Sequence, residues 1–198
     1  MSENHLRPSW NALRKRTRGL GFLKKIETKR LLLRDLKETD VRAVHDYASD
    51  PAVVRYMDWG PNNQEETAAF IQRALEAQKE KPRHHYTLAI TLKIDKKLIG
   101  SCGVHVSNPD NHEGWIGCCF NKQFWGKGYA TETSKALVEF GLKKLCLHRV
   151  FATCDPENTA SARVLEKTGM KLEGHIREHK LVKGKWRDSL LYAIIDQE

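Results

Sequence analysis

The chain has 198 residues, of which 40% are hydrophobic and 30% are charged, and these proportions fit one soluble globular domain with a short appendage. A chain of this length buries enough surface to fold without a disulfide or a structural metal. The formal net charge of +9 suits contact with nucleic acid, capture of an anionic ligand or solubility alone, and it argues mildly against polycationic substrates such as polyamines.

No apolar run is long enough to span a bilayer, and the N-terminus lacks the apolar core of a signal peptide, so we expect a cytoplasmic protein with no membrane partner. Reduced thiols agree with that compartment. No two cysteines form a Cys-x-x-Cys pair, so we expect no metal site. All except Cys119 suit small core positions. The cysteines are Cys102, Cys118, Cys119, Cys146 and Cys154.

The chain begins with a basic segment. Residues 1–25 carry seven lysine or arginine side chains. We expect a flexible arm over 1–25, followed by one domain over 26–198. The arm is either a solvated tail or an anchor to RNA or the ribosome, in which each basic side chain that touches a phosphate adds salt-dependent affinity.

Hydrophobic periodicity predicts the elements in the first half of the chain. A strand is expected over 26–34, followed by helices over 40–49 and 64–79. Asn62 or Asn63 is expected to cap the second of these helices. An antiparallel hairpin with strands over 86–94 and 97–106 follows, and a further strand over 114–120 completes this half.

The second half of the chain predicts two more helices and three more strands. A helix with a broad apolar face is expected over 131–145. A strand over 149–154 leads into a short helix over 158–167, which Gly169 closes as a C-terminal cap. A last antiparallel hairpin follows, with strands over 171–181 and 186–195.

A turn with two glycines, Gly126 and Gly128, lies between the strand that ends at Phe120 and the helix that starts at Thr131. Unpaired backbone N–H groups at a helix N-terminus attract phosphate together with the helix dipole. The glycines permit positive φ and a close approach of an anion, and Lys127 adds a positive charge. A tight turn without a ligand is the alternative. The spacing matches neither the Walker loop nor the dinucleotide fingerprint.

The pattern Gln-x-x-Gly-x-Gly that begins at Gln123 resembles the pyrophosphate-binding loop of the GCN5-related N-acetyltransferases, the GNAT superfamily. Residues 27–34 resemble the first strand of that family. Residues 155–170 are similar to a segment of its ribosomal-protein-alanine N-terminal acetyltransferases, the RimJ/RimL-like branch. The resemblance covers 26–195. It implies an α/β GNAT fold with a mixed central sheet of about seven strands, about four flanking helices, and splayed fourth and fifth strands.

The resemblance also implies that acetyl-CoA is the acetyl donor. Its pantetheine arm would pair with the backbone of the strand that ends at Phe120, like an added strand. Its pyrophosphate would bind N–H groups of the glycine turn. Asn158 would hydrogen-bond a pantetheine amide, and Ser161 would lie near the thioester sulfur. The expected contacts are Cys118, Cys119, Phe120, Gln123, Trp125, Gly126, Lys127, Gly128, Tyr129, Ala130, Asn158 and Ser161.

Acetyl transfer to an amine needs a base for the amine proton, a donor for the oxyanion and an acid for the thiolate. Relatives often use a tyrosine as the acid, but Glu166 stands at that position, so Ser161 is the candidate. The base of the branch is a glutamate on the sixth strand, where this chain has Lys180. The candidates are therefore Glu178, on the same strand face as Lys180, and Glu113. Weaker candidates near strand ends are His105, His148 and His179.

We therefore predict an acetyl-CoA-dependent N-acetyltransferase whose acceptor is a protein N-terminal α-amine, for example on a ribosomal protein. An exposed α-amine has a pKa near 8, so a fair fraction is neutral at physiological pH and a strong base is not needed. One alternative is an acetyltransferase for small amines, such as an amino acid, a polyamine or a drug. Another is a non-catalytic protein that binds RNA or the ribosome. We expect a monomer or a homodimer.

Overall fold

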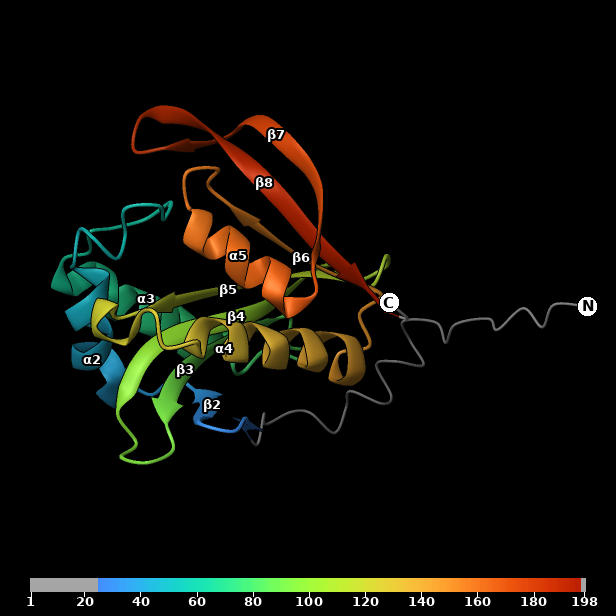
Figure 1. Ribbon diagram of the computed structural model, residues 1–198. Coiled ribbons are helices and arrows are strands. Elements are labelled where there is room, and N and C mark those ends of the chain that lie inside the picture. Colours follow the sequence, from blue (N-terminus) through green and yellow to red (C-terminus); the bar gives the residue numbers. More distant parts are fainter. Residues whose placement is uncertain (1–24, 197–198) are drawn as a thin grey trace, which may run out of the picture.

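The computed structural model describes residues 25–196 and shows one sheet with helices on both faces (Figure 1). The expected arm over 1–25 therefore lies, apart from its last residue, outside the described residues. The sheet has eight strands, one more than predicted, in the order β1-β2-β3-β4-β5-β6-β8-β7. The strands are β1 (Ile26–Glu27), β2 (Leu31–Asp35), β3 (His85–Leu92), β4 (Leu98–Asn108), β5 (Glu113–Phe120), β6 (Arg149–Cys154), β7 (Lys171–Val182) and β8 (Lys185–Ile195).

The additional strand arises because the single strand expected over 26–34 is divided in two. β1 and β2 pair antiparallel, with Ile26 opposite Leu33. Thr28 closes the turn between them, because its N–H donates to the carbonyl of Leu31 and its hydroxyl oxygen accepts from the N–H of Leu31. This tight turn directs the side chains between the two strands away from the ladder and toward a neighbouring helix.

Each face of the sheet has its own core. On one face, Leu137 and Leu165 from two helices join Val104 of β4 in a hydrophobic cluster. On the other face, Tyr47 and Ile71 from two further helices belong to a second cluster. The α-helices of the described residues are α2 (Val41–Ala48) and α3 (Gln64–Ala77) on the second face, and α4 (Tyr129–Glu139) and α5 (Thr159–Thr168) on the first (Figure 1).

Two predicted helix caps are confirmed. The side chain of Asn63 accepts the N–H of Glu66 at 2.8 Å, and the carboxylate of Glu66 accepts the N–H of Asn63 at 2.8 Å. This reciprocal pair is a capping box that starts α3. Gly169 ends α5 in the left-handed region, with φ of 97°.

The helix expected over 131–145 is longer at its start and irregular at its end. α4 already begins at Tyr129, and a π-helical turn, η3 (Phe140–Lys144), continues it. Gly141 in this turn packs against β6, where a Cβ on Gly141 would lie 3.0 Å from Cγ2 of Val150. The wide turn therefore depends on a residue without a side chain at its contact with the sheet.

The parallel strands β5 and β6 separate along their length. They pair only through residues 113–115 of β5 and 149–151 of β6. Residues 116–120 and 152–154 have no register with each other. The splay that the resemblance implied is thus confirmed. The splayed strands are numbered fifth and sixth in place of fourth and fifth, because the first expected strand is divided into β1 and β2.

The strands β7 and β8 form a long hairpin at one edge of the sheet, beyond α5 (Figure 1). Within residues 25–196, no helix is both long and apolar enough to cross a membrane. The same part of the chain contains no group of three histidine, cysteine, aspartate or glutamate side chains placed to hold a metal ion.

Candidate active site

The glycine turn lies at the N-terminus of α4 and follows the C-terminal end of β5. Gly126 and Gly128 both have positive φ, 71° and 76°. Within the described residues, the backbone N–H groups of Gly126, Lys127 and Gly128 make no hydrogen bond. Tyr129 and Ala130 follow in the first turn of α4, where N–H groups have no helical partner. Residues 126–130, which we call the donor cradle, therefore present consecutive donors suited to a phosphate.

The donor cradle has room for an anion. A Cβ placed on Gly126 would meet no atom within 4 Å. A Cβ on Gly128 would lie 3.5 Å from the guanidinium of Arg30. Lys127 contributes a second cation, whose Nζ lies 5.3 Å from the ring centroid of Phe124. The space, the free donors and the positive charge of Lys127 fit a pyrophosphate.

Internal hydrogen bonds fix the turn that leads into the donor cradle. The N–H of Trp125 donates to the carbonyl of Lys122 at 3.1 Å. The indole Nε1 of Trp125 donates to the carbonyl of Phe120 at 2.9 Å. The N–H of Gln123 donates to the side chain of Asn121 at 3.0 Å. These bonds order the loop before any ligand binds, which lowers the entropy cost of binding.

The turn between β1 and β2 supports the donor cradle from the side. Glu132 accepts the hydroxyl of Thr28 at 2.6 Å, the N–H of Arg30 at 2.8 Å and Nε of Arg30 at 2.7 Å. Arg30 also donates through Nη1 to the carbonyl of Lys127 at 2.9 Å and lies 4.4 Å from the ring centroid of Tyr129. Burial alone would raise the pKa of Glu132, but the hydrogen bonds from Thr28 and Arg30 outweigh burial and lower that pKa.

The open part of β5 carries two neutral thiols. Cys119 is only 7% exposed and belongs to the cluster on the α2 and α3 face, so the expectation that it lies outside the core is wrong. Sγ of Cys118 lies 4.0 Å from the hydroxyl of Ser134. Burial raises the pKa of the thiol to about 11 at Cys118 and to about 12 at Cys119. Neither residue therefore supplies a thiolate at neutral pH.

Asn158 and Ser161 meet at the start of α5, after the C-terminal end of β6. Asn158 is the N-cap of α5, and its side-chain oxygen accepts the N–H of Ser161 at 3.1 Å. The amide nitrogen of the Asn158 side chain makes no hydrogen bond within the described residues. Burial raises the pKa of the thiol of Cys154, the last residue of β6. Ser161 thus lies in the first turn of α5, which follows the end of β6.

The two candidate bases lie apart. Glu113 begins β5 at the paired end of the splay, and its carboxylate accepts Nε of Arg149 at 2.9 Å. Glu178 lies on β7 with φ of 47°, and its N–H donates to Asp188 at 2.8 Å. The register of β7 shifts around Glu178, so the regular alternation that would place Glu178 and Lys180 on one face is interrupted.

Of the three candidate histidines, His105 lies closest to the point where β5 and β6 separate. Its ring stacks on Trp115, the last paired residue of β5, with centroids 4.1 Å apart. Burial lowers the pKa of His105 to about 4, and His85 contributes to this shift. A neutral imidazole of such low pKa is a weak base for an amine. Of the others, His179 is exposed on β7, and His148 precedes β6.

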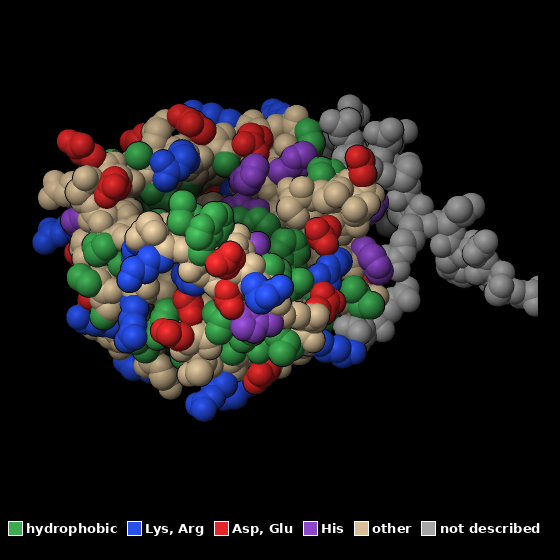
Figure 2. Space-filling view, turned by 90° about the horizontal axis from the view of Figure 1, so that it is seen from above, with side chains coloured by type: hydrophobic (Ala, Val, Ile, Leu, Met, Phe, Trp, Pro, Cys, Tyr) green, Lys and Arg blue, Asp and Glu red, His purple; other side chains and the backbone are tan. Residues whose placement is uncertain are grey.

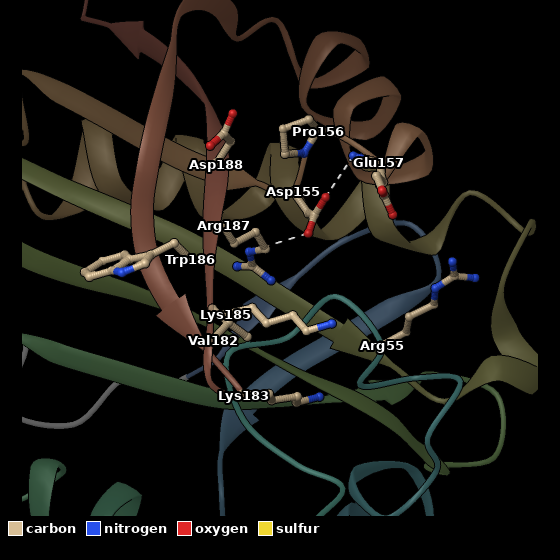
Figure 3. A pocket seen from close by; sticks show the side chains of 10 residues that line it. All are labelled: Arg55, Asp155, Pro156, Glu157, Val182, Lys183, Lys185, Trp186, Arg187 and Asp188. Atoms are coloured by element: carbon tan, nitrogen blue, oxygen red, sulfur yellow. Dashed lines mark hydrogen bonds and ion pairs between the residues drawn. The ribbon is translucent and has the colours of Figure 1, made fainter.

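A cavity of about 510 Å³ opens between the β7–β8 hairpin, the β6–α5 connection and the segment 49–63 that joins α2 to α3 (Figure 3). We call it the hairpin cavity. Its volume lies within the range of small-molecule sites. Residues 126–130 do not line it. The segment 49–63 contributes Arg55 to its lining. Seen from above, this side of the molecule is hollowed, with hydrophobic, charged and histidine side chains around the hollow (Figure 2).

Three hydrogen bonds tie the hairpin to the segment 49–63, and two of their donors, Lys183 and Arg187, also line the hairpin cavity. Two donate to backbone carbonyls and one to a carboxylate. The sequence gives no signal for them, because they join residues more than a hundred positions apart. The bonds are Lys183 to the carbonyl of Val54 at 3.0 Å, Arg187 to the carbonyl of Tyr56 at 2.8 Å, and Lys180 to Asp58 at 3.1 Å.

Comparisons with known proteins agree with this geometry. A sequence model of the acetyltransferase (GNAT) domain matches residues 30–171. The uncharacterized N-acetyltransferase YnaD of Bacillus subtilis is 36% identical over 87% of this chain and 98% of its own length. The crystal structure of a GNAT-family acetyltransferase from Bacillus anthracis has a TM-score of 0.79 and 34% identity, covering 88% of this chain and 99% of that one. The RimL ribosomal α-N-protein acetyltransferase in complex with coenzyme A has a TM-score of 0.77 at 23% identity, over 87% and 98% of the two chains.

Proposed function

Because the chain belongs to the GNAT family of acetyltransferases, we propose that it transfers the acetyl group of acetyl-CoA to the α-amine at a protein N-terminus. Membership of the family makes the chain an N-acetyltransferase, and the acceptor is the proposed part. The observation that carries the proposal is the position of two sites around the splay of β5 and β6. The donor cradle follows β5, and the hairpin cavity borders the connection that follows β6.

The donor cradle supports acetyl-CoA as the donor. Its free N–H groups and the open space at Gly126 suit a pyrophosphate. The unpaired part of β5 can accept the pantetheine arm as an added strand, and the free amide nitrogen of Asn158 can donate to a pantetheine carbonyl. RimL, which shares the fold, was solved with coenzyme A.

The transfer itself exchanges one bond for another. The neutral amine attacks the thioester carbonyl, a carbon–nitrogen bond forms, and the carbon–sulfur bond breaks as coenzyme A leaves as a thiolate. The amine loses a proton, and the thiolate takes one up. We assign Ser161 as the group that donates to the departing sulfur, because it lies in the first turn of α5, which follows the open end of β6.

We assign Glu178 as the group that accepts the amine proton. Its carboxylate has no partner within the described residues, and its N–H is bonded to Asp188, which lines the hairpin cavity. Glu113 is not assigned, because its carboxylate is bound to Arg149 at the paired end of the splay. An α-amine with a pKa near 8 needs only a weak base, which an exposed glutamate can provide.

An acceptor panel tests the proposal. The purified chain is mixed with acetyl-CoA, and thiol release is followed with peptides that have a free N-terminus, with peptides that have only a free lysine amine, and with spermidine. We expect turnover of the first group to exceed that of the other two. Faster turnover of lysine amines or spermidine would contradict the assigned acceptor while leaving the acetyltransferase activity intact.

A further inference from the structure

The hairpin cavity is lined by four basic and three acidic side chains. Lys183 lies in the turn before β8, and Lys185 begins β8. Both side chains extend toward the segment that carries Arg55 (Figure 3). Trp186 points to the opposite side (Figure 3). The basic side chains therefore approach the same space from two different segments, and the charge of this space depends on which acids remain free.

Two of the three acids are already bound within the protein. One oxygen of Asp155 accepts the N–H of Glu157 at 2.8 Å, and the other lies 3.4 Å from Nε of Arg187, at ion-pair distance but without a hydrogen bond. Asp188 accepts the N–H of Glu178 at 2.8 Å. Of the lining acids, Glu157 alone has a carboxylate without a partner in the described part of the chain.

Most of the basic side chains that line the cavity, in contrast, are not paired with a carboxylate. Lys185 and Arg55 have no carboxylate partner among residues 25–196. Lys183 donates to the carbonyl of Val54. A carbonyl carries no net charge, so the positive charge of Lys183 is not neutralised. Three positive charges therefore face one free carboxylate, that of Glu157. A carboxylate that enters this space gains charge-assisted hydrogen bonds, whereas a polycation meets repulsion.

These cations do not belong to the phosphate site. The lining of the hairpin cavity comes from the hairpin, the β6–α5 connection and the segment 49–63, and it includes no residue of the donor cradle. The positive charge is therefore available to the second substrate of the transfer, the amine acceptor.

We propose that the hairpin cavity binds a carboxylate of the acceptor, so that the enzyme prefers amines that carry an acidic group close to the amine. The inference rests on the proposed acetyl transfer and adds the chemical class of its acceptor. The carboxylate can belong to an acidic residue next to a peptide N-terminus or to a free amino acid. In both cases Lys185 and Arg55 are its partners.

The experiment compares acceptors that differ only in charge. Peptides with blocked C-termini carry aspartate, asparagine or lysine at the second position, and free aspartate forms a separate arm. We expect kcat/KM with the aspartate peptide to be about fivefold above that with the asparagine peptide, because partly exposed ion pairs contribute modestly. The lysine peptide ranks last, and added salt reduces the preference.

Variants assign the preference to the hairpin cavity. Lys185→Glu is expected to reverse the order of the aspartate and lysine peptides, a gain that misfolding cannot produce. Lys143→Gln removes one positive charge from η3, where Lys143 pairs with Glu139, and is expected to retain the preference. Faster turnover of free aspartate than of the peptides would keep the inference and replace the protein acceptor by an amino acid.

Two outcomes overturn the inference. Equal kcat/KM values for the three peptides would remove the carboxylate preference while leaving acetyl transfer to peptides standing. A complete lack of turnover with every amine, in protein that binds coenzyme A, would remove both the preference and the proposed function.

Discussion

The guanidinium of Arg30 lies 2.7 Å from the carboxylate of Glu132, and this ion pair joins residues 102 positions apart in the sequence. Glu132 belongs to the first turn of α4, and Arg30 also donates to the carbonyl of Lys127 in the donor cradle. The edge of the sheet thus holds the segment whose N–H groups would bind the pyrophosphate, and we expect cofactor affinity to depend on this distant support.

Arg30→Gln tests that dependence. The substitution removes the ion pair, the bond to Lys127 and the stacking on Tyr129, so the donor cradle loses its support. We expect the Kd for coenzyme A, measured by calorimetry, to rise about tenfold, because a hydrogen bond to a charged group contributes roughly 1.5–3 kcal/mol. Lys143→Gln, which breaks an exposed ion pair with Glu139, is the control and is expected to bind normally. Normal binding by both variants would show that the support is unnecessary.

Gly126→Ala separates backbone strain from obstruction of the anion. Gly126 has φ of 71°, so an alanine there costs about 1–2 kcal/mol of stability, and its methyl group occupies the open space of the donor cradle. Gly169→Ala is the matched control, with φ of 97° at the end of α5 and the nearest atom to a Cβ at 3.8 Å. We expect similar losses of thermal stability in the two variants, but a Kd for coenzyme A raised at least about tenfold only in Gly126→Ala. Equal affinities would place the phosphate elsewhere.

Local signals in the sequence predicted those parts of the fold and site that depend on neighbouring residues. The cap at Asn63 and the end of α5 at Gly169 follow from side chains and backbone within one turn. The support by Arg30 could not be predicted, because it requires the turn between β1 and β2 to meet α4. Cys119 was misjudged because both faces of the sheet are covered at β5, so alternation along that strand does not separate core from solvent.

The imidazole of His105 predicts a pH dependence of stability. Burial lowers its pKa in the folded protein from 6.5 to about 4, so between these values the unfolded chain binds a proton that the folded protein does not. Stability therefore falls as the pH drops from about 6.5 to about 4, by roughly 3 kcal/mol from this residue alone.

Denaturant unfolding of His105→Phe at pH 7 and pH 5 measures this contribution. Phenylalanine keeps a ring to stack on Trp115 and removes the buried Nδ1, which has no hydrogen-bond partner in the described residues. We expect the variant to lose less stability than the wild type between the two pH values. His179→Gln, at an exposed position on β7, is expected to behave like the wild type. A variant with an unchanged pH slope would assign the acid sensitivity to other groups.

Asn158→Asp separates helix capping from binding of the pantetheine arm. An aspartate keeps the oxygen that accepts the N–H of Ser161 at 3.1 Å and favours the helix dipole, but it lacks the free amide nitrogen. We expect thermal stability to be retained and the KM for acetyl-CoA to rise about tenfold, because the new carboxylate repels a carbonyl oxygen in place of donating to it.

Asn158→Ala loses the cap as well and is expected to cost about 1 kcal/mol of stability. Asn63→Asp makes the same exchange at the cap of α3 and is expected to leave both quantities unchanged. A normal KM in Asn158→Asp would limit Asn158 to its structural role at the start of α5.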